Sequence, residues 1–124
     1  MPDDKKRSTI LVVEDDTLVR MVGADVLEDA GFDVIEASNA DEALVLLSQV
    51  DDVQLLFSDV DMPGSMNGIE LARQVHERWP DIRLLITSGQ HDVSPDRLPD
   101  DGKFVRKPWT HDALVQKVRD VLRH

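Results

Sequence analysis

The sequence contains no cysteine and no tyrosine, and its only aromatic residues are two tryptophans and three phenylalanines. The absence of cysteine excludes disulfide bonds, thiolate nucleophiles and zinc sites with cysteine ligands. No apolar run is long enough to cross a membrane, which takes about 20 residues. The segment Met1–Ser8 is charged and lacks the apolar stretch of a signal peptide. We therefore expect a cytoplasmic protein in which residues 1–8 form a flexible segment before the folded domain.

Basic residues are also scarce, with 14 lysines and arginines against 25 acidic residues and a net charge of −11. Such a charge repels nucleic acids and anionic membrane surfaces, so we expect neither as a direct partner. A chain of 124 residues is close to the commonest domain size. We therefore expect one domain, at residues 9–124.

Short apolar runs alternate with stretches of helical periodicity along the whole chain. The expected strands are residues 10–13, 32–36, 55–58, 83–87 and 104–106. Helices are expected after the first, second, third and fifth of these runs. Strands that alternate with helices are typical of βαβ units, which form a parallel sheet covered on both faces. The fold class expected from this pattern is α/β, with a doubly wound parallel sheet.

Capping and turn residues set the expected helix limits. The first helix is expected to begin after Asp15 or Asp16 and to stop at Gly31. The second is expected to begin at Asn39, with Glu42 completing a capping box. The expected buried faces are Leu18, Val22, Val26 (or Leu27) and Ala30 for the first helix, and Ala40, Ala43, Leu44, Leu47 and Val50 for the second.

The helical pattern fails between the fourth and fifth strands. Residues 91–102 include Pro95 and Pro99, and only Val93 and Leu98 are apolar. A proline inside a helix costs about 3 kcal/mol. We therefore expect a short or irregular fourth helix.

Chemically active side chains follow several of the expected strands. Glu14 and Asp15 follow the first strand, Asp59 follows the third, and Lys107 follows the fifth. Parallel strands bring their carboxyl ends to one edge of the sheet, where ligands bind in open α/β folds. The acids and the lysine suggest a site that holds a divalent cation and carries a phosphoryl group on Asp59.

Simpler roles compete for some of these residues. Acids at a helix start are often only caps, and we assign that role to Asp16. Asp59 alone could be a turn residue before Pro63-Gly64, and Lys107 alone could be a solvated lysine. Of the two hydroxyls after the fourth strand, Thr87 rather than Ser88 is expected to face the site. Trp79 and Trp109 are expected to be packing residues.

Taken in order, these features resemble the receiver domain of two-component response regulators, from about Thr9 to Leu122. The shared features are the acidic pair, the acceptor aspartate, the following Met-Pro-Gly loop, the hydroxyl after the fourth strand and the Lys-Pro after the fifth. The resemblance implies a flavodoxin-like fold with five parallel strands in the order 2-1-3-4-5.

The resemblance also implies a function and its residues. Asp59 would be phosphorylated by a sensor histidine kinase or a histidine phosphotransfer protein, forming an aspartyl phosphate. Mg²⁺ would be held by Glu14, Asp15, Asp59 and the backbone carbonyl of Asp61. Thr87 and Lys107 would contact the phosphoryl group, and Phe104 would take part in the switch. The domain would then signal through a downstream protein or a phosphorelay rather than act as an enzyme.

The sequence departs from the usual family pattern at three places. Glu14 stands where aspartate is commoner, residues 63–68 form a loop one residue longer than usual, and the fourth-helix segment is rich in proline. In many receivers the fourth-helix face carries the output, and the prolines of this segment are expected to remodel that face here. The chain ends at His124, directly after the last expected helix, so no output domain is expected.

Two other functions fit parts of the pattern. Asp59-Val60-Asp61 resembles the Asp-x-Asp motif of phosphatases of the haloacid-dehalogenase type, although those carry it on the first strand of a larger domain. A binding module that no longer takes phosphate is the third reading, against which the complete set of acids and lysine argues.

Overall fold

The computed structural model describes residues 7–64, 66–90, 94, 97–99 and 102–123. Its helices and strands follow one another in a regular alternation as far as β4. In chain order they are β1 (Thr9–Val13), α1 (Thr17–Asp29), β2 (Asp33–Ala37), α2 (Ala40–Gln49), β3 (Val53–Asp59), α3 (Gly68–Arg78), β4 (Arg83–Ser88), β5 (Lys103–Arg106) and α4 (His111–Arg123).

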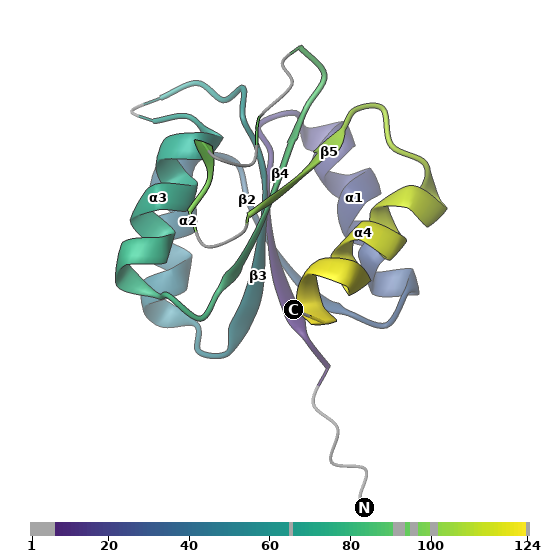
Figure 1. The fold of residues 1–124 in the computed structure, drawn as a ribbon, viewed down its shortest axis with the longest axis horizontal. Coiled ribbons are helices and arrows are strands. Elements are labelled where there is room, and N and C mark those ends of the chain that lie inside the picture. Colours follow the sequence, from purple (N-terminus) through teal and green to yellow (C-terminus); the bar gives the residue numbers. More distant parts are fainter. Residues whose placement is uncertain (1–6, 65, 91–93, 95–96, 100–101, 124) are drawn as a thin grey trace, which may run out of the picture.

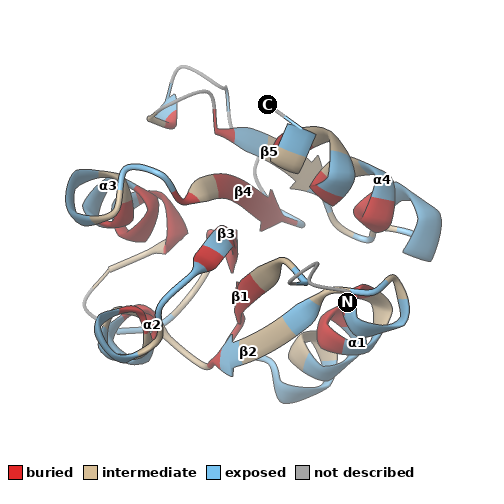
Figure 2. Cartoon of the chain, turned by 90° about the horizontal axis from the view of Figure 1, so that it is seen from below, coloured by how far each residue is buried: buried red, intermediate tan, exposed pale blue. Residues whose placement is uncertain are grey.

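The five strands form one parallel sheet in the order β2-β1-β3-β4-β5. Helices α2 and α3 cover one face, and α1 and α4 cover the other (Figure 1). Two apolar clusters fill the spaces between sheet and helices, one on each face. The buried residues lie on the strands and on the helix sides turned toward them (Figure 2). The expected fold class and strand order are confirmed.

Strand register brings the carboxyl ends of the central strands level with one another. Val13 pairs with Ser58, and Asp59 pairs with Thr87. Glu14 follows directly after β1, and its backbone N–H donates to the carbonyl of Ala37 at the end of β2 (3.1 Å). The acid after β1 and the acid at the end of β3 therefore lie at the same edge of the sheet.

The buried face expected for α1 is confirmed at Leu27 and wrong at Leu18 and Val22. Leu18 and Val22 are exposed, at 70% and 46% of their possible surface, whereas Gly23, Ala24 and Leu27 are buried. Apolar residues occur around most of the circumference of this helix, so periodicity did not single out one face. The small residues turn inward, where they allow the helix to approach the sheet closely.

Helix caps largely agree with the expected helix starts. Asp16 is the N-cap of α1, and Asn39 caps α2 by accepting the N–H of Glu42 (2.8 Å). The Glu42 carboxylate, however, accepts from the backbone of Ser38 rather than of Asn39, so the expected capping box is displaced by one residue. Helix α3 has a complete capping box, formed by Asn67 and Glu70.

The structure describes only part of the segment on which the irregular fourth helix was expected. The described residues between β4 and β5 include no α-helix. Leu98 is 6% exposed and joins the apolar cluster beneath α2 and α3. Most of the expected flexible segment at residues 1–8 also lies outside the described part of the chain. Among the described residues, no helix is both long and apolar enough to span a membrane.

Candidate functional site

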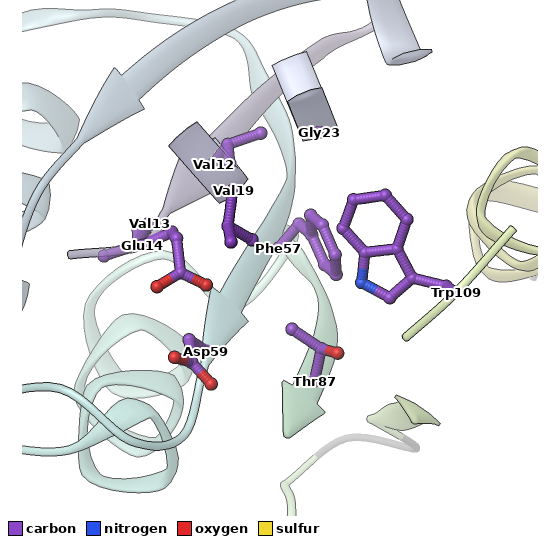
Figure 3. Close-up of a pocket in the computed structure, with 9 residues that line it drawn as sticks. All are labelled: Val12, Val13, Glu14, Val19, Gly23, Phe57, Asp59, Thr87 and Trp109. Carbon is purple, nitrogen blue, oxygen red and sulfur yellow. The ribbon is translucent and has the colours of Figure 1, made fainter. Parts of the chain in front are cut away.

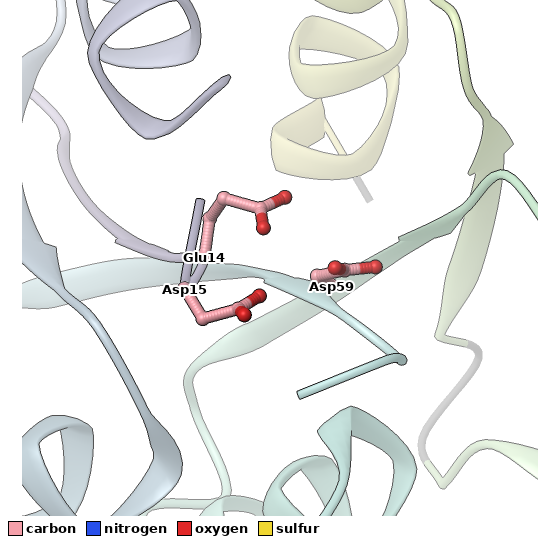
Figure 4. Close-up of side chains that lie close together, drawn as sticks. All are labelled: Glu14, Asp15 and Asp59. Carbon is pink, nitrogen blue, oxygen red and sulfur yellow. The ribbon is translucent and has the colours of Figure 1, made fainter. Parts of the chain in front are cut away.

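Three carboxylates meet at the carboxyl edge of the sheet. Glu14, Asp15 and Asp59 each offer an oxygen, and these oxygens lie within 4.8 Å of one another (Figure 4). Glu14 and Asp59 are 5% and 4% exposed, whereas Asp15 is exposed to solvent. Like charges this close repel one another unless a cation lies among them.

The backbone at Glu14 is held on both sides of the residue. Its N–H donates to Ala37, and its carbonyl accepts a 2.8 Å hydrogen bond from Nη1 of Arg20 on α1. Arg20 also pairs with Glu36 on β2, at 3.2 Å. Arg20 was not among the residues expected at the site, because an arginine in a helix carries no signal in the sequence that its side chain turns back to a strand end.

Lys107 supplies the cation of the site in this structure. Its Nζ lies 2.7 Å from Oε1 of Glu14 and 3.3 Å from Oδ2 of Asp59. The lysine side chain is 23% exposed, so its charge is only partly screened by water. Lys107 reaches the site because its N–H donates to the carbonyl of Ser88 (3.0 Å), which extends the pairing of β4 and β5 by one residue.

Burial and mutual repulsion determine the protonation of these groups. Burial raises the pKa of Asp59, and the charge of Asp61 adds to the rise, against the opposing influence of Lys107. Burial likewise raises the pKa of Glu14, with a contribution from Asp59. Burial alone would lower the pKa of Lys107, but its bond to Glu14 and the charge of Asp59 outweigh this and raise it. The lysine therefore stays charged between two carboxylates that are costly to ionise.

Asp61 lies in the loop after β3 and is joined to the end of β4. Its carboxylate Oδ2 accepts a 2.8 Å hydrogen bond from the hydroxyl of Ser88, and its N–H donates to Oδ1 of Asp59 at 3.3 Å. Ser88 also accepts from the N–H of Gln90. Ser88 therefore connects the loop after β3 with the loop after β4, a role that the sequence did not reveal.

Thr87 and Trp109 line a small cavity beside the carboxylates. The cavity, of about 10 Å³, is bounded by Glu14, Asp59, Thr87, Trp109, Val12, Val13, Val19, Gly23 and Phe57 (Figure 3). The hydroxyl of Thr87 and the indole nitrogen of Trp109 are both buried, and neither has a hydrogen-bond partner among the described residues. Thr87 therefore has a hydroxyl donor available next to Asp59.

Trp109 closes this cavity from the loop before α4. Its ring packs against Phe57, with centroids 6.1 Å apart and planes at 60°, and lies over Gly23 of α1. Trp109 was expected from the sequence to be a packing residue, and it does pack against the apolar cluster beneath α1 and α4. That it also lines the same cavity as Asp59 was not expected. Its place two residues after Lys107 was the only available signal.

Gly68 is required by the course of the chain after Asp59. A Cβ at this position would overlap the carbonyl oxygen of Asp59 and would lie 2.8 Å from its carbonyl carbon. The start of α3 therefore packs directly on the backbone of Asp59. Any side chain at residue 68 would displace Asp59 or α3.

Phe104 lies on the other face of the sheet from Thr87. On β5, Phe104 pairs with Ile86, whereas Val105 pairs with Thr87. Phe104 packs against the apolar cluster beneath α2 and α3, and Val105 against the cluster beneath α1 and α4. A switch that involves both Thr87 and Phe104 would have to act across the end of the sheet, because the two side chains are not neighbours on one face.

The donor set matches a hard divalent cation. All three clustered ligands are carboxylates, the oxygen donors that Mg²⁺ and Ca²⁺ prefer, and no nitrogen or sulfur ligand accompanies them in the cluster. The backbone N–H of Asp16 donates to Oε2 of Glu14 (3.1 Å) and helps to orient that carboxylate. The cluster could therefore bind a metal ion.

Comparisons with known proteins agree with this arrangement. The sequence model of one protein family, the response regulator receiver domain, matches residues 10–119 of this chain. The chain is 36% identical over 116 residues to the response regulator receiver protein CpdR of Brucella abortus, covering 91% of this chain and 95% of that protein. It is 34% identical over 119 residues to a chemotaxis protein CheY homolog of Campylobacter jejuni, covering 91% of each chain.

Larger proteins contain a similar domain. The chain is 36% identical to part of the sensor kinase CckA of Brucella abortus, covering 93% of this chain but 12% of that protein. It likewise spans 24% of the hydrogenase transcriptional regulatory protein HoxA of Cupriavidus necator.

A solved structure shows the same fold. The receiver domain of the hybrid histidine kinase CckA superposes with a TM-score of 0.80 at 30% identity, over 93% of this chain and 99% of that chain. The order of the strands, the polar residues at their carboxyl ends and these similarities lead to one assignment: the chain belongs to the family of response regulator receiver domains.

Proposed function

We propose that this domain accepts a phosphoryl group on Asp59 from a phosphohistidine of a sensor histidine kinase or a histidine phosphotransfer protein. The observation that carries the proposal is the meeting of Asp59 with two further acids and Lys107 at one edge of the sheet. A phosphorylated domain would then bind a downstream protein or pass the group on in a phosphorelay. The same site could also lose the group to water.

The reaction exchanges one phosphorus bond for another. A carboxylate oxygen of Asp59 attacks phosphorus, the P–N bond to the donor imidazole breaks, and the imidazole leaves with the bond electrons. Attack requires an ionised Asp59, and neighbouring Lys107 favours this form. Lys107 then pairs with the oxygens of the transferred group as a point charge. Such transfers depend on positioning and charge more than on a general base.

Glu14, Asp15 and Asp59 are the residues that would hold Mg²⁺, together with the backbone carbonyl of Asp61. A bound Mg²⁺ neutralises charge shared between the carboxylates and the phosphoryl oxygens. Glu14 and Asp59 supply oxygens from a buried setting, and Asp15 completes the set from the solvent side.

Thr87 is the proposed sensor of phosphorylation. Its hydroxyl is buried at 3% exposure beside Asp59 and has no partner among the described residues, so a phosphoryl oxygen would satisfy it. Movement of Thr87 toward the group would alter the end of β4. Phe104 is proposed to respond from the other face of β5, which makes the switch a shift between two packings.

The donor protein is proposed to dock on α1. Leu18, Met21 and Val22 are exposed apolar residues of this helix, at 70%, 51% and 46%. A groove of about 290 Å³ separates the helix from the loop before α4, and it is lined by Leu18, Val19, Val22, Lys107, Pro108 and Trp109. Because Lys107 lines both the groove and the site, a protein seated there is placed next to Asp59.

Incubation with Mg²⁺ and a small phosphodonor such as acetyl phosphate tests the central proposal. Wild type should form one adduct that hydroxylamine removes, and Asp59→Asn should form none. Rapid repeated turnover of the donor would indicate a phosphatase instead, and the absence of any adduct would indicate a binding module. Adduct formation at an unchanged rate in Asp59→Asn would overturn the assignment of the acceptor.

A matched pair of surface variants tests the docking face. Val22→Ser on α1 should slow transfer from a phosphohistidine protein by roughly tenfold, the scale of a lost interface contact. Val45→Ser on α2 is the control, because Val45 is 53% exposed but lies on a helix of the other face. Neither variant should alter labelling by acetyl phosphate. Equal rates of protein-mediated transfer in the two variants would contradict docking on α1.

A further inference from the structure

The amine of Lys107 lies closer to a proposed metal ligand than to the acceptor aspartate. Its distance to Oε1 of Glu14 is 2.7 Å, against 3.3 Å to Oδ2 of Asp59. All three side chains are largely buried, so the contacts are little screened by solvent. The stronger hydrogen bond of the lysine is therefore made to Glu14.

The length of the glutamate side chain makes this bond possible. The backbone of Glu14 is fixed by the hydrogen bonds to Ala37 and Arg20. An aspartate on the same backbone would withdraw its carboxylate by about one C–C bond, ~1.5 Å. The distance to the amine would then be roughly 4 Å, beyond a direct hydrogen bond. Lys107 could follow the shorter side chain only by moving away from Asp59.

We propose that Glu14 acts as a latch, which means that its hydrogen bond holds Lys107 until a metal ion binds at the carboxylates. Metal binding and release of the lysine are then coupled. This inference rests on the proposed function, because it concerns the same metal site. The carboxylate of Glu14 has two competing uses, as partner of the lysine and as part of the cation site. The bond to Lys107 therefore lowers metal affinity, and by reciprocity an occupied metal site weakens the bond to Lys107. The released amine, which already lies 3.3 Å from Asp59, is then available to an arriving phosphoryl group.

A simpler effect must be separated from the latch. Any positive charge near the carboxylates repels a metal ion through space, whatever the length of residue 14. That repulsion would be nearly the same in chains with glutamate or aspartate at this position. Only the direct bond depends on the extra methylene, so the two explanations differ in whether residues 14 and 107 are coupled.

A double-mutant cycle on Mg²⁺ affinity makes this separation. The proteins are wild type, Glu14→Asp, Lys107→Met and the double variant, with dissociation constants measured by calorimetry and by tryptophan fluorescence. Lys107→Met should tighten Mg²⁺ binding in the Glu14 chain by about tenfold more than in the Glu14→Asp chain, within the range of coupling between sites. An equal tightening in both chains would overturn the latch. If wild type binds no Mg²⁺, the metal site of the proposed function fails as well.

A second measurement keeps Lys107 in place and so does not depend on the folding of its variant. The side-chain nitrogen signal of Lys107 is followed by NMR in ¹⁵N-lysine-labelled protein during a Mg²⁺ titration. In wild type the signal should shift as Mg²⁺ saturates the site, because the lysine loses its bond to Glu14. In Glu14→Asp the shift should be much smaller. Equal shifts in the two proteins would contradict the latch even where Mg²⁺ binding itself is normal.

Discussion

The middles and the carboxyl ends of strands β1, β3 and β4 differ in what they bury. In their middles, the strands bury only apolar side chains, such as Leu11, Leu56 and Leu85, each fully buried. At or just beyond their carboxyl ends lie Glu14, Ser58, Asp59, Thr87 and Ser88, and no other polar or charged residue among those described is buried. The sheet thus has an apolar interior and one polar edge.

The apolar middles and the polar edge contribute differently to the stability of the domain. Burial of apolar surface favours folding at roughly 25 cal/mol per Å². Burial of a carboxylate opposes folding unless the charge is compensated, and at this edge the lysine compensates only in part. We infer that the apolar middles stabilise the fold while the polar edge reduces its stability in the absence of a ligand.

The largest expected effect is in the apolar part of β4. Leu85→Ala removes a fully buried side chain from the cluster between the sheet and helices α1 and α4. It should lower the free energy of unfolding by about 2–5 kcal/mol, measured by urea denaturation. The folded protein should retain Mg²⁺ affinity close to that of wild type. A large loss of affinity would show that the middle and edge of the strand are not separable.

The next effect concerns the close approach of α3 to Asp59. Gly68→Ala should cost about 1–3 kcal/mol of stability, because its methyl group overlaps the Asp59 backbone. It should also weaken Mg²⁺ binding. Gly23→Ala is the control, because its new Cβ would lie at an ordinary contact distance of 3.5 Å from Trp109. This substitution should also stabilise α1 by about 1 kcal/mol, because alanine has a higher helix propensity than glycine. Equal destabilisation by both changes would refute the special constraint at residue 68.

Removing the buried charge at the edge should have a smaller effect of opposite sign. Asp59→Asn should stabilise the metal-free protein at pH 7 by about 1 kcal/mol, the scale of common stabilising changes. Because burial raises the pKa of folded Asp59 above 3.8, wild type loses stability as pH rises through that raised value. The difference in stability between the variant and wild type should therefore shrink as pH falls, and disappear near pH 3.8. An advantage independent of pH, measured by denaturation between pH 4 and 7, would contradict this origin.

Mg²⁺ should make wild type more stable than Asp59→Asn. Saturating Mg²⁺ stabilises the form that binds it, and Asp59→Asn lacks one of the three clustered carboxylates. The melting temperature of wild type should therefore rise more than that of the variant. An identical rise in both would place the metal away from Asp59.

Sequence could predict the apolar middles better than the polar edge. The short apolar runs predicted the five strands, and their alternation with helices predicted a parallel sheet. The order of the strands came from the resemblance to receiver domains. The expected face of α1 was wrong at Leu18 and Val22, because these residues satisfy helical periodicity while Gly23 and Ala24 are the residues buried against the sheet. Small residues give little hydrophobic signal, although they decide how closely a helix packs.

At the edge, the identity of the residues was predictable but their connections were not. The order of acids, hydroxyl and lysine along the chain indicated which side chains would gather. The bonds from Arg20 to Glu14 and from Ser88 to Asp61 depend on the rotation of a helix and on strand register. Neither bond is encoded in spacing along the chain, which is why both connections were missed.

The smallest expected change in stability provides the finest test of the edge. Asp15 and Asp16 are adjacent and exposed, but only Asp15 joins the carboxylate cluster, while Asp16 caps α1 through the N–H groups of Leu18 and Val19. Asp16→Ala should lower stability by about 1 kcal/mol with little change in Mg²⁺ affinity. Asp15→Ala should change metal-free stability by at most about 0.5 kcal/mol and weaken Mg²⁺ binding far more. Equal losses of affinity in the two variants would mean that total charge, rather than the position of the carboxylate, determines binding.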